Sequence, residues 1–250
     1  MQMEVVINPK YEYLKDFVYR LPEVFSSEGE TIYKSRNEIK VFESPVSLNV
    51  KQYKVPSFFN RLVYTFVRPA KALRAYRYAF ELLEKGFDTP EPVGYILFKK
   101  YGLIHRSYFI SIQSPYTRRF YEFGEGPVEG REDIIRAFAR YTAGLHEAGI
   151  CHGDYSPGNI LFEKQNGQIR FTLVDINRMK FGEVGLETGC ANFARMWGRP
   201  DFFRIVADEY ARARHFDPHA CFRLIMEKRN KFWKKYARSH SLPFDLGGTI

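Results

Sequence analysis

The stretch His152-Gly153-Asp154-Tyr155-Ser156-Pro157-Gly158-Asn159-Ile160-Leu161 decides the fold of this chain, together with Val174-Asp175 further along. Pro157-Gly158 favours a turn, and this turn can return Asn159 to the same side of the loop as Asp154. An amide and a carboxylate then face one cavity.

A predicted hairpin follows this loop. Asn166-Gly167 stands between two apolar runs, which is the strongest short-range hairpin signal. The hairpin would bring Asp175 back beside Asp154 and Asn159.

Phosphoryl transfer requires a carboxylate that orients the attacking hydroxyl, oxygen ligands for magnesium and a cation on the nucleotide phosphates. Asp154 suits the first role, and Asn159 and Asp175 suit the second. H-G-D alone is also compatible with an ordinary capped turn, but its combination with the hairpin favours phosphoryl transfer.

The pattern H-G-D-x-x-x-x-N, a hairpin and an apolar strand ending in Asp resembles the catalytic and metal-binding loops of the protein-kinase-like superfamily. Among its members, the chain resembles the bacterial lipopolysaccharide core kinases, which phosphorylate Kdo or heptose sugars. The resemblance also rests on residues 173–179, on the turn at 86–92 and on 106–112. It implies an α+β, two-lobed fold. A small lobe at 1–113 would hold a mainly antiparallel sheet and one helix, and a larger, mainly helical lobe at 114–250 would hold the catalytic and metal-binding loops.

Three segments with short alternating patterns, at 31–33, 38–42 and 47–53, predict strands of the small lobe. In the third segment, alternation buries Leu48 and Val50. By the resemblance, the next residue, Lys51, projects toward the nucleotide phosphates. Lys54 lies close enough to be the alternative.

The turn between the first two of these strands has no glycine, although related kinases carry a glycine-rich phosphate loop at this place. Without glycine the backbone approaches phosphates less freely. The side chains of Ser35, Arg36 and Asn37 are therefore expected to contribute to phosphate binding.

Residues 71–85 have helical apolar spacing and end at Gly86, so they predict a helix. By the resemblance, this helix carries a glutamate that pairs with the lysine, but the family positions fall on Ala75 or Arg77. Glu81, one turn after Arg77, is the expected substitute, and ordinary surface charge is the alternative for it.

The resemblance implies a hinge at 107–113 whose backbone recognises adenine, with Ile112 as a candidate contact. Residues 131–148 predict a long helix of the larger lobe with a core-facing apolar side. Its His146 is expected to be a helix-end partner, and His152 is expected to be a buried scaffold residue.

Beyond Asp175 the chain lacks both D-F-G and A-P-E, so the long activation segment of protein kinases is missing and a non-protein substrate is favoured. Arg178 either contacts the substrate or braces the loop by pairing with an acidic side chain.

The composition predicts a compact intracellular enzyme. With 250 residues, 45% of them hydrophobic, the chain can bury a sizeable core. The three cysteines are unpatterned, which argues against a disulfide framework or a zinc site. Neither a secretion signal nor an apolar stretch of spanning length occurs, so the reduced cytosol is the expected compartment.

Basic charge suggests an anionic partner. The formal net charge is +9, residues 44–80 contain neither Asp nor Glu, and a second basic stretch at 223–238 alternates with apolar residues. Such faces suit an anionic membrane surface. Nucleic acid binding, or a merely solvated face, is the alternative.

Together these features predict a kinase that uses ATP and Mg²⁺ to phosphorylate a sugar hydroxyl of the lipopolysaccharide inner core, peripherally on the inner face of the cytoplasmic membrane. Asp154 and Lys51 would be catalytic. One alternative is a cytosolic small-molecule kinase resembling aminoglycoside or choline kinases, and an acidic patch would favour it. The other is a pseudokinase that binds anionic lipid, which the missing loop glycine favours.

Overall fold

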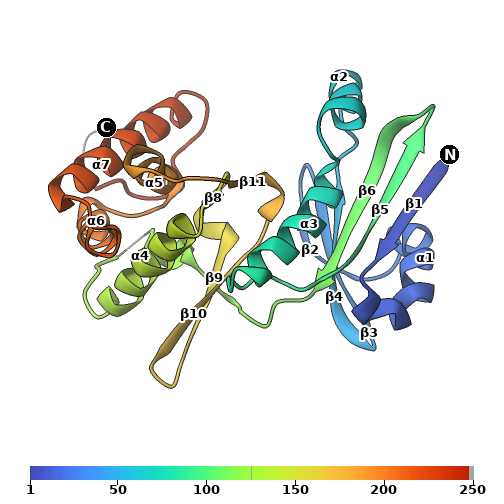
Figure 1. Cartoon of the computed structure of the whole chain (residues 1–250), viewed down its shortest axis with the longest axis horizontal. Coiled ribbons are helices and arrows are strands. Elements are labelled where there is room, and N and C mark those ends of the chain that lie inside the picture. The colour runs from blue at the N-terminus through green and yellow to red at the C-terminus, as the bar shows by residue number, and fades with distance from the viewer. Residues whose placement is uncertain (125, 248–250) are drawn as a thin grey trace. The chain divides into compact units, whose positions relative to one another are not determined.

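The computed structural model describes residues 1–124 and 126–247, and the chain divides into two compact units, Met1–Pro115 and Tyr116–Ile250. The first unit is built on an antiparallel sheet, and the second is mainly helical (Figure 1). The predicted α+β architecture, with a sheet-bearing unit followed by a mainly helical unit, is present.

The sheet of the first unit has six strands in the order β1-β5-β6-β4-β3-β2, and all neighbouring pairs are antiparallel. The strands are β1 (Gln2–Ile7), β2 (Glu30–Lys34), β3 (Glu38–Ser44), β4 (Val46–Tyr53), β5 (Pro92–Lys100) and β6 (Leu103–Ile112). The three strands predicted at 31–33, 38–42 and 47–53 are β2, β3 and β4, so that prediction is confirmed.

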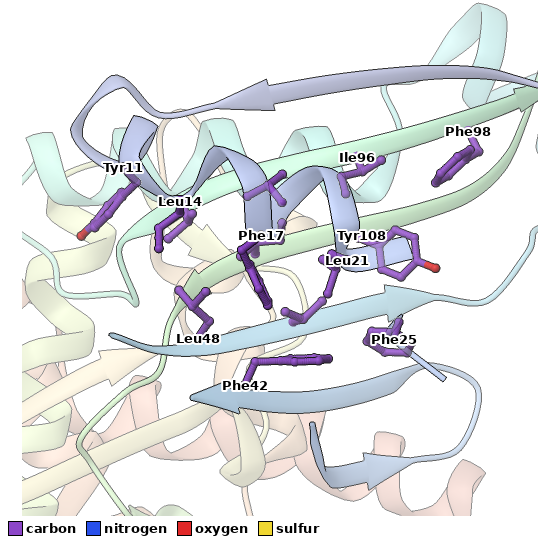
Figure 2. Close-up of a cluster of buried hydrophobic side chains, with 14 residues drawn as sticks. Tyr11, Leu14, Phe17, Leu21, Phe25, Phe42, Leu48, Ile96, Phe98 and Tyr108 are labelled. Carbon is purple, nitrogen blue, oxygen red and sulfur yellow. The ribbon is translucent and has the colours of Figure 1, made fainter. Parts of the chain in front are cut away.

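One face of this sheet is covered by the short 3₁₀ helix η1 (Pro9–Leu14) and by α1 (Lys15–Val24). Figure 2 shows the buried cluster between them and the strands, where Phe17 meets Phe42 edge to face with 5.5 Å between ring centroids. Leu48 and Val50 of β4 belong to this cluster and are fully buried. The alternation expected for β4 is therefore present.

The opposite face carries α3 (Lys71–Glu84) (Figure 1). The small side chains of Ala72 and Ala79 are fully buried on this helix, and they let the helix backbone lie close to the strands. Tyr76 packs edge to face on Tyr95 of β5. The helix predicted at 71–85 is confirmed. Before it lie α2 (Phe58–Leu62) and a wider π-type turn, η2 (Val63–Val67).

The second unit packs its helices around an aromatic core in which Phe138 contacts Phe120, Tyr155 and Phe193. Its helices are α4 (Glu132–Glu147), α5 (Leu186–Asn192), α6 (Pro200–Arg214) and α7 (Pro218–Tyr236), with the short 3₁₀ turns η3 (Phe120–Phe123), η4 (Pro157–Asn159), η5 (Ile176–Arg178) and η6 (Phe193–Arg195). Its strands are β7 (Arg118–Arg119), β8 (Ile150–His152), β9 (Ile160–Gln165), β10 (Gln168–Leu173) and β11 (Met179–Phe181). The helix predicted at 131–148 is α4.

The predicted hairpin is formed by β9 and β10, which pair antiparallel. The two residues between them, Asn166 and Gly167, have φ angles of +50° and +76°. Both angles lie in the left-handed region that a tight two-residue hairpin turn needs, and Asn-Gly is the pair that adopts it most readily. The hairpin prediction is confirmed.

Candidate active site

His152 is the structural centre of the loop at 152–159, which carries Asp154 and Asn159. It ends β8, is 1% exposed, and its Nε2 bonds the Val174 carbonyl at 3.1 Å. Its Nδ1 accepts the backbone N–H of Asp154 at 3.0 Å. Burial lowers the pKa of His152, so the ring stays neutral and can accept this hydrogen bond. The expected scaffold role of His152 is confirmed.

Gly153 is required by the close approach of two chain segments. β8 pairs with β11, and a Cβ atom on Gly153 would lie 2.3 Å from the carbonyl oxygen of Arg178. Real Cβ atoms are not found so close to a backbone oxygen. The glycine of H-G-D therefore lets the loop carrying Asp154 lie directly against the segment that follows Asp175.

The turn after Asp154 returns Asn159 as the sequence predicts. The side-chain amide of Asn159 donates to the Asp154 carbonyl at 2.8 Å, and the backbone N–H of Ser156 donates to the same oxygen at 2.9 Å. The backbone N–H of Val174 then donates to the Asn159 carbonyl at 3.0 Å, which fixes the start of the Asp175 segment. The structure thus brings Asp154, Asn159 and Asp175 together in the second unit.

Asn159 and Asp175 offer oxygen atoms that fit a magnesium ion. The Asn159 amide nitrogen makes the bond to Asp154, which leaves the amide oxygen as the atom suited to a metal. Asp175 has a left-handed φ of +55°, and its Oδ1 accepts from the side chain of Asn177. Magnesium is commonly held by one or two such protein oxygens together with nucleotide phosphates.

Lys51 of the first unit lies on β4, on the sheet face that carries α3, and is 8% exposed. Its Nζ lies 5.3 Å from the ring centroid of Tyr53, a residue of the cluster beneath α3. Lys54, the alternative, follows the end of β4 and is exposed. Burial beside α3 favours Lys51 of the two as the cation of a site.

The other predicted residues of the first unit lie on separate elements. Ser35 and Arg36 are exposed in the turn between β2 and β3, and Asn37 Oδ1 accepts the Lys54 backbone N–H at 3.2 Å. Glu81 lies half-buried on α3 and makes no side-chain hydrogen bond or ion pair within residues 1–124 and 126–247. The structure gives no support to Glu81 as an ion-pair partner.

Ile112 ends β6 and packs against the core beneath α1. Its backbone N–H donates to the Glu91 carbonyl at 2.9 Å, and the N–H of Gln113 donates to the Ser47 carbonyl at 2.9 Å. Both backbone amide groups at this strand end therefore donate to backbone carbonyls of the same unit.

Comparison with known proteins identifies the family. A family model described as "Lipopolysaccharide kinase (Kdo/WaaP) family" matches residues 57–196, which is more than half of the chain. The chain belongs to this family. A comparison with curated proteins gives no significant match. The suspected family and the enzyme class, a phosphotransferase, are both confirmed. The matched residues contain Asp154, Asn159 and Asp175, whereas Lys51 lies before them.

A solved structure supports the fold, and the predicted protein-kinase-like fold class is confirmed. A structure titled "WaaP in complex with acyl carrier protein" is 14% identical and has a TM-score of 0.64, and the match covers 93% of this chain and 99% of that one. Lower TM-scores come from two kinases. The Rio2 kinase of Chaetomium thermophilum gives a TM-score of 0.42 at 12% identity, and the match covers 96% of this chain and 65% of that one. A MAP kinase of Leishmania major gives a TM-score of 0.45 at 13% identity, and the match covers 94% of this chain and 75% of that one.

In this lipopolysaccharide kinase, two arginines hold the carboxylate of Asp154, one on each oxygen. Arg178 Nη1 donates to Oδ2 at 3.1 Å, and Arg195 Nη1 donates to Oδ1. The Arg195 guanidinium also lies over the Phe232 ring, 5.1 Å from its centroid. The bracing role considered for Arg178 is confirmed. Arg195 was missed, because nothing in the sequence links a residue at the end of η6 to Asp154.

A buried polar chain supports the loop from behind. His146 of α4 bonds the Tyr210 hydroxyl through Nδ1 at 2.8 Å and the Asn192 amide oxygen through Nε2 at 3.0 Å. The Asn192 nitrogen donates to the His152 carbonyl at 2.9 Å. Burial lowers the pKa of His146 from 6.5 to about 4. His146 is thus a helix-end partner, as expected, and Asn192 is a supporting residue that the sequence did not reveal.

Proposed function

We propose that this kinase transfers the γ-phosphoryl group of ATP to a sugar hydroxyl of the lipopolysaccharide inner core, on Kdo or heptose, at the cytoplasmic face of the membrane. The observation that carries the proposal is the grouping of Asp154, Asn159 and Asp175 within a chain of the lipopolysaccharide kinase family. This grouping supplies the acidic and oxygen-donor groups that phosphoryl transfer needs.

Asp154 accepts a hydrogen bond from the acceptor hydroxyl and orients its oxygen toward the phosphorus atom. Its side chain is 20% exposed, so solvent and substrate can reach it. Asn159 and Asp175 would hold magnesium, which supplies charge neutralisation on the phosphates when it is bound. Because Arg178 and Arg195 fix the two carboxylate oxygens, they act as positioning residues.

Nucleotide binding is assigned to residues 1–113, and catalysis and metal binding to residues 114–250. Lys51 would bind the phosphates, and the exposed turn at 35–37 would add donors from Ser35, Arg36 and Asn37. Adenine would be recognised by carbonyl oxygens near Ile112, because the amide donors there are used. Glu81 stays a candidate for supporting Lys51.

A protein partner is proposed in addition to the glycolipid. The similar WaaP was solved in complex with acyl carrier protein, and a partner of this kind is therefore a candidate for the present chain as well. The acceptor and the partner are separable, because phosphate transfer and complex formation have different assays.

The deciding experiment compares Asp154→Asn, Asp175→Asn and Asp208→Asn. Asp208 is an exposed aspartate of α6 and is the matched control. ATP turnover is measured with magnesium and lipid A that bears either Kdo or heptose, and nucleotide binding is measured in parallel. We expect Asp154→Asn to keep nucleotide binding but to lose roughly a hundred- to ten-thousandfold in kcat. Asp175→Asn should weaken magnesium-dependent nucleotide binding, and Asp208→Asn should behave as wild type. Undiminished turnover of Asp154→Asn would refute the assignment.

A further inference from the structure

Five large apolar side chains on neighbouring segments of the first unit are exposed to solvent. Phe58 and Phe59 of α2 are 68% and 76% exposed, Phe66 and Val67 of η2 are 76% and 80% exposed, and Tyr101 in the β5–β6 turn is 91% exposed. We call these five residues the apolar tip. Figure 1 shows α2 beyond the N-terminal end of α3. Exposed apolar groups gathered in this way mark an interaction site.

The apolar tip is attached to the sheet by specific hydrogen bonds. Arg61 Nε donates to the Ile104 carbonyl at 2.9 Å, and Arg61 Nη2 donates to the Lys100 carbonyl at 3.4 Å. The Ile104 N–H donates in turn to Thr65 Oγ1 at 3.1 Å. Because α2 and η2 are tied to the β5–β6 hairpin, the phenylalanines and Tyr101 are presented together on a fixed support.

The charges around the apolar tip are basic. Residues 44–80, which include α2 and η2, contain no acidic residue, and Lys54, Arg68 and Lys100 are exposed on the segments that carry the tip or flank it. A second copy of this chain is a poor occupant, because each copy carries a net charge of +9 and would repel the other. The partner that fits is anionic and has an apolar layer beneath its charges.

The second basic stretch of the sequence does not offer such a surface. On α7, Ile225 and Trp233 are 0% and 4% exposed. Phe232 and Tyr236 pack against the small core that holds Trp233 and Phe244. The large apolar residues of α7 are therefore buried or half-buried within the second unit, and none is exposed like those of the apolar tip.

We propose that the apolar tip inserts into the headgroup region of an anionic phospholipid bilayer and docks the kinase there. Aromatic side chains occupy this depth of a bilayer, while flanking Lys and Arg bind the anionic headgroups. None of the described helices combines the length and the apolar composition that a membrane crossing requires. The inference rests on the proposed function for its biological setting, since the acceptor is a lipid, but the docking surface stands on its own observations.

The test is sedimentation of the full chain with vesicles of phosphatidylcholine alone and of phosphatidylcholine mixed with phosphatidylglycerol. We expect wild type to bind the anionic vesicles and to bind the neutral ones far more weakly. The double variant Phe58→Ser/Phe59→Ser should lose affinity by on the order of a hundredfold, from the apolar burial removed. Tyr13→Ser/Tyr19→Ser, which changes two exposed aromatics elsewhere in the same unit, should bind as wild type.

Charge variants provide an independent readout. Arg68→Gln/Lys100→Gln should weaken binding by about fivefold for each charge, whereas Lys234→Gln/Lys235→Gln on α7 should change it much less. Equal binding by wild type and Phe58→Ser/Phe59→Ser would overturn the docking inference, as would a greater loss of affinity from the α7 pair.

Turnover on a delipidated, soluble acceptor distinguishes the docking inference from the proposed function. If the phenylalanine variant keeps wild-type turnover there while losing vesicle binding, docking is supported. If wild type binds vesicles through the tip but phosphorylates no core sugar, only the proposed function fails.

Discussion

Replacing Arg195 tests whether the guanidinium groups at Asp154 position the carboxylate that we propose orients the acceptor hydroxyl. Rotation about the terminal bond of an aspartate has a broad, roughly two-fold profile, so the carboxylate needs external contacts to stay in one orientation. Arg195 holds Oδ1, and Arg178 holds Oδ2. In Arg195→Gln one of these contacts is lost, and the carboxylate can turn away from the acceptor hydroxyl.

The structure gives the expected magnitudes. Two unit charges about 4 Å apart attract by about 4 kcal/mol at an effective dielectric constant of about 20, but exposed pairs retain only about 0.2–1 kcal/mol. Asp154 is 20% and Arg195 is 40% exposed, so the loss in unfolding free energy should be about 1 kcal/mol. The loss in kcat should be larger, on the order of tenfold, because a small displacement of a catalytic group has a large effect on rate.

The assay is kcat at saturating ATP and acceptor, with thermal unfolding in parallel. Arg195→Lys keeps the charge and should recover part of the lost kcat. Arg223→Gln, on the exposed side of α7, is the control for loss of a surface arginine. An Arg195→Gln enzyme with wild-type kcat would refute the positioning role. A rise in kcat would refute it in the opposite sense, because it would show that the arginine holds Asp154 away from its substrate.

Two further predictions concern stability. Gly153→Ala should lower the free energy of unfolding by about 1–3 kcal/mol and reduce turnover, because its Cβ would meet the Arg178 carbonyl. Gly185→Ala has open space for its Cβ but lies at the N-cap of α5, so it should cost less than about 1 kcal/mol and leave turnover unchanged. Denaturant titration and turnover of both variants check this. The low pKa of His146, about 4 against 6.5, means that between these pH values the unfolded chain binds a proton that the folded chain does not. Stability should fall by about 3 kcal/mol as the pH drops from 6.5 to 4. His146→Gln should remove that part of the pH dependence in denaturant titrations, and an unchanged pH profile would contradict it.

The sequence predicted the elements whose signals are local. β3 and β4 alternate because each has one face on the core, and the β9–β10 turn needs Asn166-Gly167 for its left-handed angles. β1 and α1 were not predicted, because β1 obtains its place only by pairing with β5, far along the chain. α2 was missed for a related reason: its apolar residues do not face a core at all, so no burial pattern marks it.

The same division applies to the candidate active site. The grouping of Asp154, Asn159 and Asp175 could be predicted because a turn and a hairpin, both local, set their positions. Arg195 and Asn192 could not, because they reach the catalytic loop through the packing of α5 and η6, which no short motif encodes. Residues that act through tertiary packing leave only an ordinary polar side chain in the sequence.

The supporting residues show why the loop that carries Asp154 depends on the whole second unit. The His152 carbonyl is bonded by Asn192 of α5, and Asn192 is bonded by His146 of α4, which also bonds Tyr210 of α6. Each of these groups is buried or half-buried, so a lost partner would leave an unsatisfied polar atom at a cost of about 1–3 kcal/mol. The three helices are thereby coupled to the loop, and the position of Asp154 is a property of their packing rather than of the H-G-D motif alone.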